Sequence, residues 1–483
     1  MEFVTDLHLH SKYSRAVSPQ MVLPEMAKWA AKKGINLLTS GDFTHPLWFR
    51  NIKAELEEAG EGVYKLRIPA SAKATAGKQD EGLRINEVRF ILTTEIASIF
   101  KQGEKLRRIH NLVFAPSIEI AEKINQELLS RACNLSSDGR PIIGLSSKNL
   151  LEMLLAIDKK IILIPCHAWT PHFGIYGSAS GFDSIKESFE ELSNYIYGIE
   201  TGISSDPWMN WQIEELNNRS ILSFSDAHSL PKMGRELTVF EINKTLDSLS
   251  YVDIGKAISY PLRKKSGRNV ASESGVAYTV EFYPEEGKYH YTGHRNCKVT
   301  KSPQQIKEDG SICSVCNRRL TEGVMYRVQQ LVRLQSPEAT ADGGQTKQEK
   351  DFRPYNSHSD SKGVLWIDDP RKVHPSFVKL VPLNEIIAES IGSPVGSERV
   401  KIQFDEMCLE FDSEINILLK TPIQDLSKFA GGKIAEGVAK VRRGDIVIEP
   451  GYDGEYGKVK IWNGESDAAK EELETENQLG LKF

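Results

Sequence analysis

Short runs of hydrophobic residues recur along residues 1–230, and stretches with a helical pattern lie between them, as at 24–33, 117–131 and 184–195. Strands that alternate with helices predict a parallel sheet. Most of the runs end at a histidine, aspartate or glutamate. Polar groups that follow successive strands are typical of α/β barrels, because the C-terminal ends of barrel strands carry the active site. We therefore expect an α/β barrel in this part of the chain.

The polar residues that end the runs are of the types that bind metal ions. His8 and His10 follow the run 3–7, and side chains two residues apart on a strand share a face. Histidine with carboxylate suits Zn, Mn or Fe, and a carboxylate such as Glu95 can bridge two ions. The candidate metal ligands are His8, His10, Asp42, Glu95, His110, His167, Asp226 and His228.

Such a cluster suits phosphoester hydrolysis. Two metals about 4 Å apart can activate a water and hold the attacking and leaving oxygens of a phosphate ester. We expect roughly two to three divalent ions (Zn, Mn, Mg or Fe) at the site. The candidate catalytic residues are His8, His10, Glu95 and Asp226.

A second metal site is predicted by the cysteines. His294 and Cys297 form one pair with two residues between them, and Cys313 and Cys316 form another. Two such pairs provide the four ligands of a closed, structural zinc site. His290 is an alternative fourth ligand, and free thiols beside a surface histidine are the alternative to a metal site. Six cysteines in 483 residues favour a cytoplasmic protein over a disulfide-rich secreted one. If the protein binds DNA, we expect it to be nucleoid-associated within the cytoplasm.

Positive charge is concentrated around these cysteines. The whole chain has a net charge of −5, which excludes a globally basic coat protein, but residues 256–334 hold 14 Lys and Arg against 7 Asp and Glu. Cations together with aromatic residues such as Tyr289 and Tyr291 suit phosphate contact and base stacking. Arg318 and Arg319 are therefore candidate DNA contacts, and a solvated charged surface is the alternative for each.

Composition changes along the chain divide it into five parts. We expect the barrel at 1–258, a basic zinc-binding domain at 259–334, a flexible polar insert at 335–375, a mostly helical DNA-binding domain at 376–463 and an acidic tail at 464–483. Within the helical domain, the pattern predicts helices at 383–391, at 398–411 and between a Gly431-Gly432 turn and residue 443.

The metal-binding motifs resemble those of the PHP family of metal-dependent phosphoesterases. The matching motifs are Leu7-His8-Leu9-His10-Ser11, Thr94-Glu95, Ile109-His110 and Ser225-Asp226-Ala227-His228. The resemblance covers residues 1–235 and implies a distorted (β/α)7 barrel. The chain departs from the family at Ser18, where an Asp is frequent, and at Asp42-Phe43-Thr44-His45, where Thr-Asp-His is frequent. Asp42 is therefore the first candidate, and His45 the second, for a ligand of a third ion.

Three loops resemble, more narrowly, the endonuclease Q group of that family: 40–46, 165–171 and 200–207. The similarity continues through the cysteines to 448–457. It implies a DNA repair endonuclease that cuts on the 5′ side of uracil, hypoxanthine, xanthine or an abasic site. A damaged base inside a duplex is buried, so it would flip into a pocket. The candidates to bind substrate, with a core or loop role as the alternative, are Trp169, His172, Glu200, Ser204, Asp206, Arg318 and Arg319.

Two other functions fit parts of the sequence. A small-molecule phosphatase of the histidinol-phosphate type would use the same metal ligands, but it leaves the zinc-binding and basic segments unexplained. A non-catalytic DNA-binding protein with a degenerate barrel would explain those segments, but the ligand set is complete.

The last six residues contain a candidate partner-binding motif. Gln478, Leu481 and Phe483 resemble the C-terminal peptides with which bacterial repair polymerases bind their β sliding clamp. The acidic stretch 471–476 should keep this motif solvated and accessible. We expect a sliding clamp as partner, and a frayed terminus is the alternative.

Overall fold

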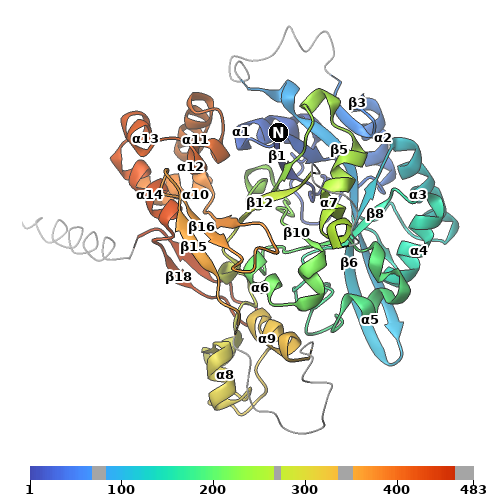
Figure 1. The fold of residues 1–483 in the computed structure, drawn as a ribbon. Coiled ribbons are helices and arrows are strands. Elements are labelled where there is room, and N and C mark those ends of the chain that lie inside the picture. Colours follow the sequence, from blue (N-terminus) through green and yellow to red (C-terminus); the bar gives the residue numbers. More distant parts are fainter. Residues whose placement is uncertain (68–82, 266–273, 335–351, 463–483) are drawn as a thin grey trace, which may run out of the picture.

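The structure, a computed structural model, describes residues 1–67, 83–265, 274–334 and 352–462. Strands from both halves of the chain join one large sheet, and helices pack around it (Figure 1). Residues 383–443 form a group of helices to one side of this sheet (Figure 1). The predicted fold class, α/β followed by a mostly helical C-terminal domain, is confirmed.

Seven strands make the wall of the barrel: β1 (Glu2–Asp6), β2 (Leu37–Thr39), β5 (Arg89–Gln102), β6 (Lys105–Ala115), β8 (Ile162–Pro165), β9 (Gly198–Glu200) and β10 (Ser220–Leu222). Parallel pairing joins β1 to β2, β2 to β5, and β9 to β10. A bridge between Leu9 and Ala227 connects the segments that follow β1 and β10, and it closes the wall at the end where the predicted ligands lie.

The direction of β6 differs from the prediction of a parallel sheet. β6 runs antiparallel to both β5 and β8. It follows β5 after a tight turn at Gly103, and strands joined by so short a turn can pair only in antiparallel fashion. The sheet is therefore mixed.

Further strands extend the sheet on both sides of the barrel. β3 (Leu56–Gly60) and β4 (Val63–Leu66) form a hairpin at one edge, and β7 (Ile142–Ile143) pairs with β5. On the other side the order continues from β1 through β11 (Leu237–Glu241), β12 (Gly275–Glu281), β17 (Phe377–Lys379), β16 (Leu365–Asp368) and β15 (Asn356–Ser359).

This extension corrects two predicted boundaries. β12 was expected inside the zinc-binding domain 259–334, but it pairs with β11 and β17 in the main sheet. The predicted insert 335–375 contains β15 and β16, so residues 352–375 are part of the fold, and residues 335–351 lie outside the described residues. All four side chains of β15 are exposed. An exposed edge strand with polar side chains carries no hydrophobic pattern from which it could be predicted.

Seven helices surround the barrel: α1 (Leu23–Lys33), α2 (Pro46–Glu55), α3 (Ile118–Ser130), α4 (Ser147–Ile157), α5 (Ile185–Phe189), α6 (Pro207–Trp211) and α7 (Tyr251–Lys265). Local sequence sets their ends. Ser117 accepts a hydrogen bond from the Ile120 backbone N–H (3.3 Å) and starts α3, and Gly34 at φ 83° ends α1.

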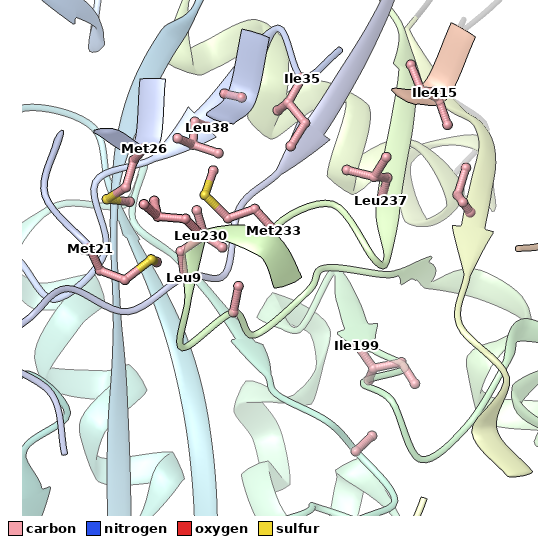
Figure 2. Packing of buried hydrophobic residues seen from close by; sticks show 14 of the residues in the cluster. Leu9, Met21, Met26, Ile35, Leu38, Ile199, Leu230, Met233, Leu237 and Ile415 are labelled. Carbon is pink, nitrogen blue, oxygen red and sulfur yellow. The ribbon is translucent and has the colours of Figure 1, made fainter. Parts of the chain in front are cut away.

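Buried hydrophobic residues connect the barrel to the C-terminal helices. Leu9, Met21, Leu38 and Met233 lie close together in one buried hydrophobic cluster (Figure 2). The same cluster includes Ile415 from the C-terminal domain. The two parts therefore share one core.

The C-terminal domain is mostly helical, as predicted: α10 (Leu383–Ile391), α11 (Glu398–Glu410), α12 (Glu414–Leu419), α13 (Ile423–Ala430) and α14 (Gly432–Arg443), followed by the hairpin of β18 (Val447–Glu449) and β19 (Lys458–Lys460). Arg442 of α14 is buried and donates hydrogen bonds to the carbonyls of Ile417, Leu418 and Thr421 at the end of α12. This arginine therefore stabilises the helix packing rather than facing a ligand.

The cysteine region forms a smaller unit of β13 (Thr292–His294), β14 (Val299–Lys301), α8 (Pro303–Asp309) and α9 (Val324–Leu334), with α8 at the bottom of the view in Figure 1. Arg327 of α9 donates to the Tyr176 carbonyl (3.0 Å) and pairs with Asp183 (2.6 Å), which attaches this unit to the barrel. None of the helices described in the structure has the length and apolarity needed to cross a membrane.

Candidate active site

The structure brings six predicted metal ligands together. His8, His10, His167 and Asp226 follow β1, β8 and β10, whereas Glu95 and His110 lie within β5 and β6. One group comprises His8, His10 and Asp226, and another comprises Glu95, His110 and His167; the ligand atoms within each group lie within 4.8 Å of one another. Glu95 connects the groups. Its Oε2 lies 3.2 Å from His10 Nε2, and its Oε1 lies 3.1 Å from His167 Nε2.

The site is suited to hold cations. Within the part of the chain that the structure describes, the buried atoms His8 Nε2, His10 Nε2 and Asp226 Oδ1 make no hydrogen bond of normal geometry. Buried polar atoms normally have partners, and a convergent set without them points to an ion. Histidine nitrogens with carboxylate oxygens are the donors that divalent transition metals prefer. The two groups that share Glu95 therefore fit two ions.

Two carboxylates orient the first two histidines from behind. Glu200 Oε1 lies 2.8 Å from His8 Nδ1, and Asp42 Oδ1 lies 3.0 Å from His10 Nδ1. Each bond leaves the Nε2 atom of the ring free to face the site. Partners of this kind fix the tautomer and orientation of a metal-binding histidine.

These positions correct two predictions. Asp42, predicted as a metal ligand, uses Oδ2 to accept hydrogen bonds from Ser11 N, Ser11 Oγ and Ser14 Oγ, so both of its oxygens are engaged away from the site. Glu200, predicted to bind substrate, is fully buried and accepts the His167 backbone N–H at 2.8 Å. Both residues position ligands.

The electrostatics of the site favour cation binding. Burial raises the pKa of Asp226, but the neighbouring His8 and His10 outweigh this effect and hold it below its ordinary value. Burial lowers the pKa of His8, but Glu200 and Asp226 outweigh it and raise that pKa well above its usual range. Asp226 is therefore ionised, and a metal ion would displace protons from the imidazoles.

The other predicted site residues of the barrel have three kinds of environment: structural, beside the ligand groups, and accessible to a ligand. Trp169 is buried and donates to Asn210 Oδ1 (2.7 Å), and Asp206 pairs with Lys379 (2.6 Å) and caps α6, so both are structural. His228 lies edge-on to His10 but outside the ligand groups of the described residues, with its side chain 31% exposed. His172 is exposed and Ser204 half-buried, so both are accessible to a ligand.

Two residues of the site were not predicted from the sequence. Cys166 is fully buried, and its thiol lies with His8 and Glu95 in a third group of candidate ligand atoms. Arg140 places Nη1 3.2 Å from Glu95 Oε2. Arg140 lies in an Asp-Gly-Arg-Pro sequence, which predicts a turn but gives no indication of a chemical role. Cys166 could have been found, because it directly precedes the predicted ligand His167.

The second predicted metal site also assembles. His294, Cys297, Cys313 and Cys316 have ligand atoms within 4.8 Å of one another, and His290 is absent from that group. Burial raises the pKa of the Cys313 thiol, but hydrogen bonds from the Cys316 backbone and the His294 side chain outweigh it and lower that pKa to about 6. A thiolate at neutral pH is the form that binds zinc.

Comparison with known proteins gives relatives over most of the chain. The family model described as MJ0043 C-terminal domain matches residues 382–445. The uncharacterized protein YqxK of Bacillus subtilis is 27% identical over 475 residues, which cover 94% of this chain and 98% of that protein. The uncharacterized protein MJ0043 of Methanocaldococcus jannaschii is 28% identical over 317 residues, 65% of this chain but 34% of that protein, so this chain spans about a third of its length.

Two solved structures share the fold along nearly the whole chain. The lesion-specific endonuclease PfuEndoQ from Pyrococcus furiosus has a TM-score of 0.72 and 27% identity, and the match covers 98% of this chain and 99% of that one. An endonuclease Q in complex with a 27-mer duplex substrate, with an abasic lesion at the active site, has a TM-score of 0.71 and 27% identity, covering 96% and 97%.

Fold and similarity together define a class: the chain is an endodeoxyribonuclease built on an α/β sheet. Within that class the chain is similar to endonuclease Q over nearly its whole length, as the loop motifs predicted.

Proposed function

We propose that this endonuclease cuts duplex DNA on the 5′ side of deaminated bases (uracil, hypoxanthine and xanthine) and of abasic sites. The observation that carries the proposal is the similarity over 96% of the chain to an endonuclease Q bound to a duplex with an abasic lesion. The two ligand groups that share Glu95 support a metal-dependent hydrolysis. A phosphatase acting on small molecules would need neither the helical domain nor the unit of residues 292–334, which contains the proposed zinc ligands and is called the zinc-binding unit below.

The chain provides a scaffold for two divalent ions (Zn, Mn, Mg or Fe), held by His8, His10 and Asp226 and by Glu95, His110 and His167. When bound, such ions activate a water and stabilise charge on the phosphate. Glu95 supplies one oxygen to each group, and Glu200 and Asp42 hold the rings of His8 and His10. The described part of the site thus contains the groups needed for hydrolysis without a protein nucleophile.

Recognition of the lesion is assigned to the loops around this centre and to the zinc-binding unit. We expect the damaged base to flip out of the duplex, because a base stacked inside a duplex is buried and cannot otherwise enter a protein pocket. His172 and Ser204, which follow ligand-bearing strands and remain accessible, are the retained candidates to contact the base. Arg318 and Arg319 have exposed side chains on the zinc-binding unit, which supports the proposal that they contact DNA phosphates.

The test is a panel of labelled duplexes, each with one uracil, hypoxanthine, xanthine or abasic site, incubated with the protein and Mn²⁺ or Mg²⁺. We expect a single nick at the phosphate 5′ of each lesion and none in the undamaged duplex. Hydrolysis of a phosphomonoester alone would support the phosphatase instead, and binding without a nick would support a non-catalytic DNA-binding protein.

A further inference from the structure

Arg140 lies inside the active site although neither ligand group uses it. Its Nη1 is 3.2 Å from Glu95 Oε2, the same oxygen that faces His10 Nε2 at 3.2 Å. The Glu95 side chain is fully buried, whereas the Arg140 side chain is 23% exposed. A permanent cation therefore contacts the carboxylate that joins the two groups, and its outer part remains open to an incoming ligand.

The backbone on either side of Arg140 is fixed. Its N–H donates to Asp138 Oδ1 (3.1 Å), the Gly139 carbonyl accepts from Thr44 Oγ1 (3.2 Å), and the Pro141 carbonyl accepts from the Ala97 N–H (3.0 Å). A Cβ at Gly139 would lie 2.4 Å from Asp42 Oδ2, so only glycine fits there. The turn therefore packs against Asp42, which orients His10, and these contacts fix the position from which the Arg140 side chain enters the site.

The guanidinium keeps most of its donors free. Within the described residues, its one hydrogen bond is to Glu95. A guanidinium carries five N–H groups in a planar fork, and that fork matches two oxygens of a phosphate. Arginine is not deprotonated in proteins, so its charge is permanent.

The charge balance calls for an anion at this position. Ions held by the two groups would place further positive charge beside Arg140, and Glu95 and Asp226 would neutralise only part of it. A phosphodiester brings negative charge, and more develops on its oxygens during hydrolysis. A fixed arginine that meets this developing charge is a recurrent device in phosphoryl transfer.

We propose that Arg140 is a catalytic residue that binds a non-bridging oxygen of the phosphate being cut and stabilises the charge that develops on it. This role rests on the proposed function and adds a protein cation to the metal centre. The alternative is a positioning residue that only holds Glu95 in place, and the two roles differ in whether Arg140 contacts DNA.

Arg140→Ala separates these roles through binding and metal content. In an Asp226→Asn background, which should bind a uracil duplex without cutting it, loss of one phosphate contact should lower the slope of log affinity against log salt by about one. Metal content by elemental analysis should stay at the level of the Asp226→Asn parent. Arg131→Ala is the matched control, because Arg131 is an exposed arginine paired with Glu127 outside the site. An unchanged slope, or a loss of ions relative to the parent, would overturn the proposal in favour of the positioning role.

Catalysis supplies the second measurement. With Asp226 intact, Arg140→Ala should nick a uracil duplex about 100-fold more slowly than wild type in single turnover. Added guanidinium chloride should restore part of the rate, and ethylammonium chloride at equal ionic strength should not. Arg140→Lys keeps the charge without the fork, so it should remain slow and gain nothing from guanidinium. Wild-type rates in both variants would overturn the proposal. If wild type itself fails to nick, the proposed function fails, and the salt slope still tests the phosphate contact.

Discussion

Asp42, His167 and Asp226 have backbone φ angles of 47°, 27° and 45°, a region that non-glycine residues rarely occupy. All three lie at the end of the barrel where ligands converge. Such strain costs of order 1–3 kcal/mol per residue and persists only where surrounding contacts enforce it. For His167 the enforcement is visible: a Cβ at Gly202, which has φ +57°, would lie 2.4 Å from His167 Cβ, so the next loop packs directly on the ligand.

The first prediction follows from the position of Asp42 behind His10. Asp42→Asn should weaken the affinity of the active-site ions by about 10–100-fold, because a neutral amide no longer holds the imidazole in its ligating tautomer. The measurement is competition with a chelator, followed by elemental analysis. The control is Asp405→Asn. Asp405 lies on the C-terminal domain, outside the site, and its carboxylate pairs with Lys32 of α1. A saturated Asp42→Asn protein that lacks one ion entirely would show instead that Asp42 is itself a ligand.

At the scale of elements, local patterns predicted helices well and strand relations poorly. The 383–391 helix has the predicted bounds, because its hydrophobic positions follow a helical repeat. Strand direction depends on which runs pair, and β15 showed no pattern because solvent surrounds its side chains. At the site, the sequence identified the ligand types. The sequence could not show that Glu200 contacts Nδ1 of His8 and Asp42 contacts Nδ1 of His10. Those contacts depend on how strands far apart in the sequence are placed.

A second prediction concerns β12. Glu281 is fully buried and accepts a hydrogen bond from Ser223 Oγ (2.6 Å). Among the described residues, the side-chain oxygens of the buried Glu236 make no hydrogen bond of normal geometry. Burial raises the pKa of Glu281 from 4.5 to about 8, Asp206 adds to this, and Ser223, Thr279 and Lys379 oppose it. The folded protein therefore retains a proton that the unfolded chain releases, so this contribution to stability is lost as pH rises from 4.5 to about 8.

Glu281→Gln should remove that pH dependence, because an amide of the same size does not ionise. The melting temperature of the wild type should fall more steeply between about pH 5 and 8 than that of the variant, as measured by circular dichroism. Parallel melting curves across this range would show that Glu281 ionises in the folded protein at an ordinary pH.

A third prediction concerns the zinc-binding unit. Cys313→Ala with Cys316→Ala should lose about one zinc per chain and weaken DNA binding, because a structural zinc folds its own segment. Cys133→Ala, a half-buried cysteine elsewhere, is the control. Unchanged zinc by elemental analysis would contradict the assignment of these four ligands.

At the scale of the whole molecule, the segment that follows the C-terminal helices packs back against the cysteine-containing unit. After the C-terminal helices, the Gly451 carbonyl accepts from the Tyr291 N–H (2.9 Å), and Asp453 Oδ2 accepts from the Arg295 N–H (2.7 Å) of the zinc-binding unit. Lys379 of β17 pairs with Asp206 of the barrel at 2.6 Å. The zinc-binding unit is therefore held by both the barrel and the C-terminal segment.

A fourth prediction concerns the C-terminal tail, which lies outside the described residues. A peptide covering 471–483 should bind a bacterial β sliding clamp, because leucine and phenylalanine anchors suit an apolar pocket and the glutamine can hydrogen-bond beside it. The control peptide carries Ala at Gln478, Leu481 and Phe483. Equal binding of the two peptides in a calorimetric titration, or no binding of either, would exclude the tail as a clamp ligand.

The central claim is that the centre built from His8, His10, Glu95 and Asp226 cuts DNA at lesions. The most direct test compares wild type with Asp226→Asn on a duplex with one uracil, in single turnover with Mn²⁺, with affinity measured in parallel. We predict a nick 5′ of the uracil by the wild type and a loss of at least about 100-fold in rate by the variant, with affinity nearly unchanged, because the substitution alters a ligand and not the DNA-binding surface. A variant that nicks at close to the wild-type rate would contradict this account.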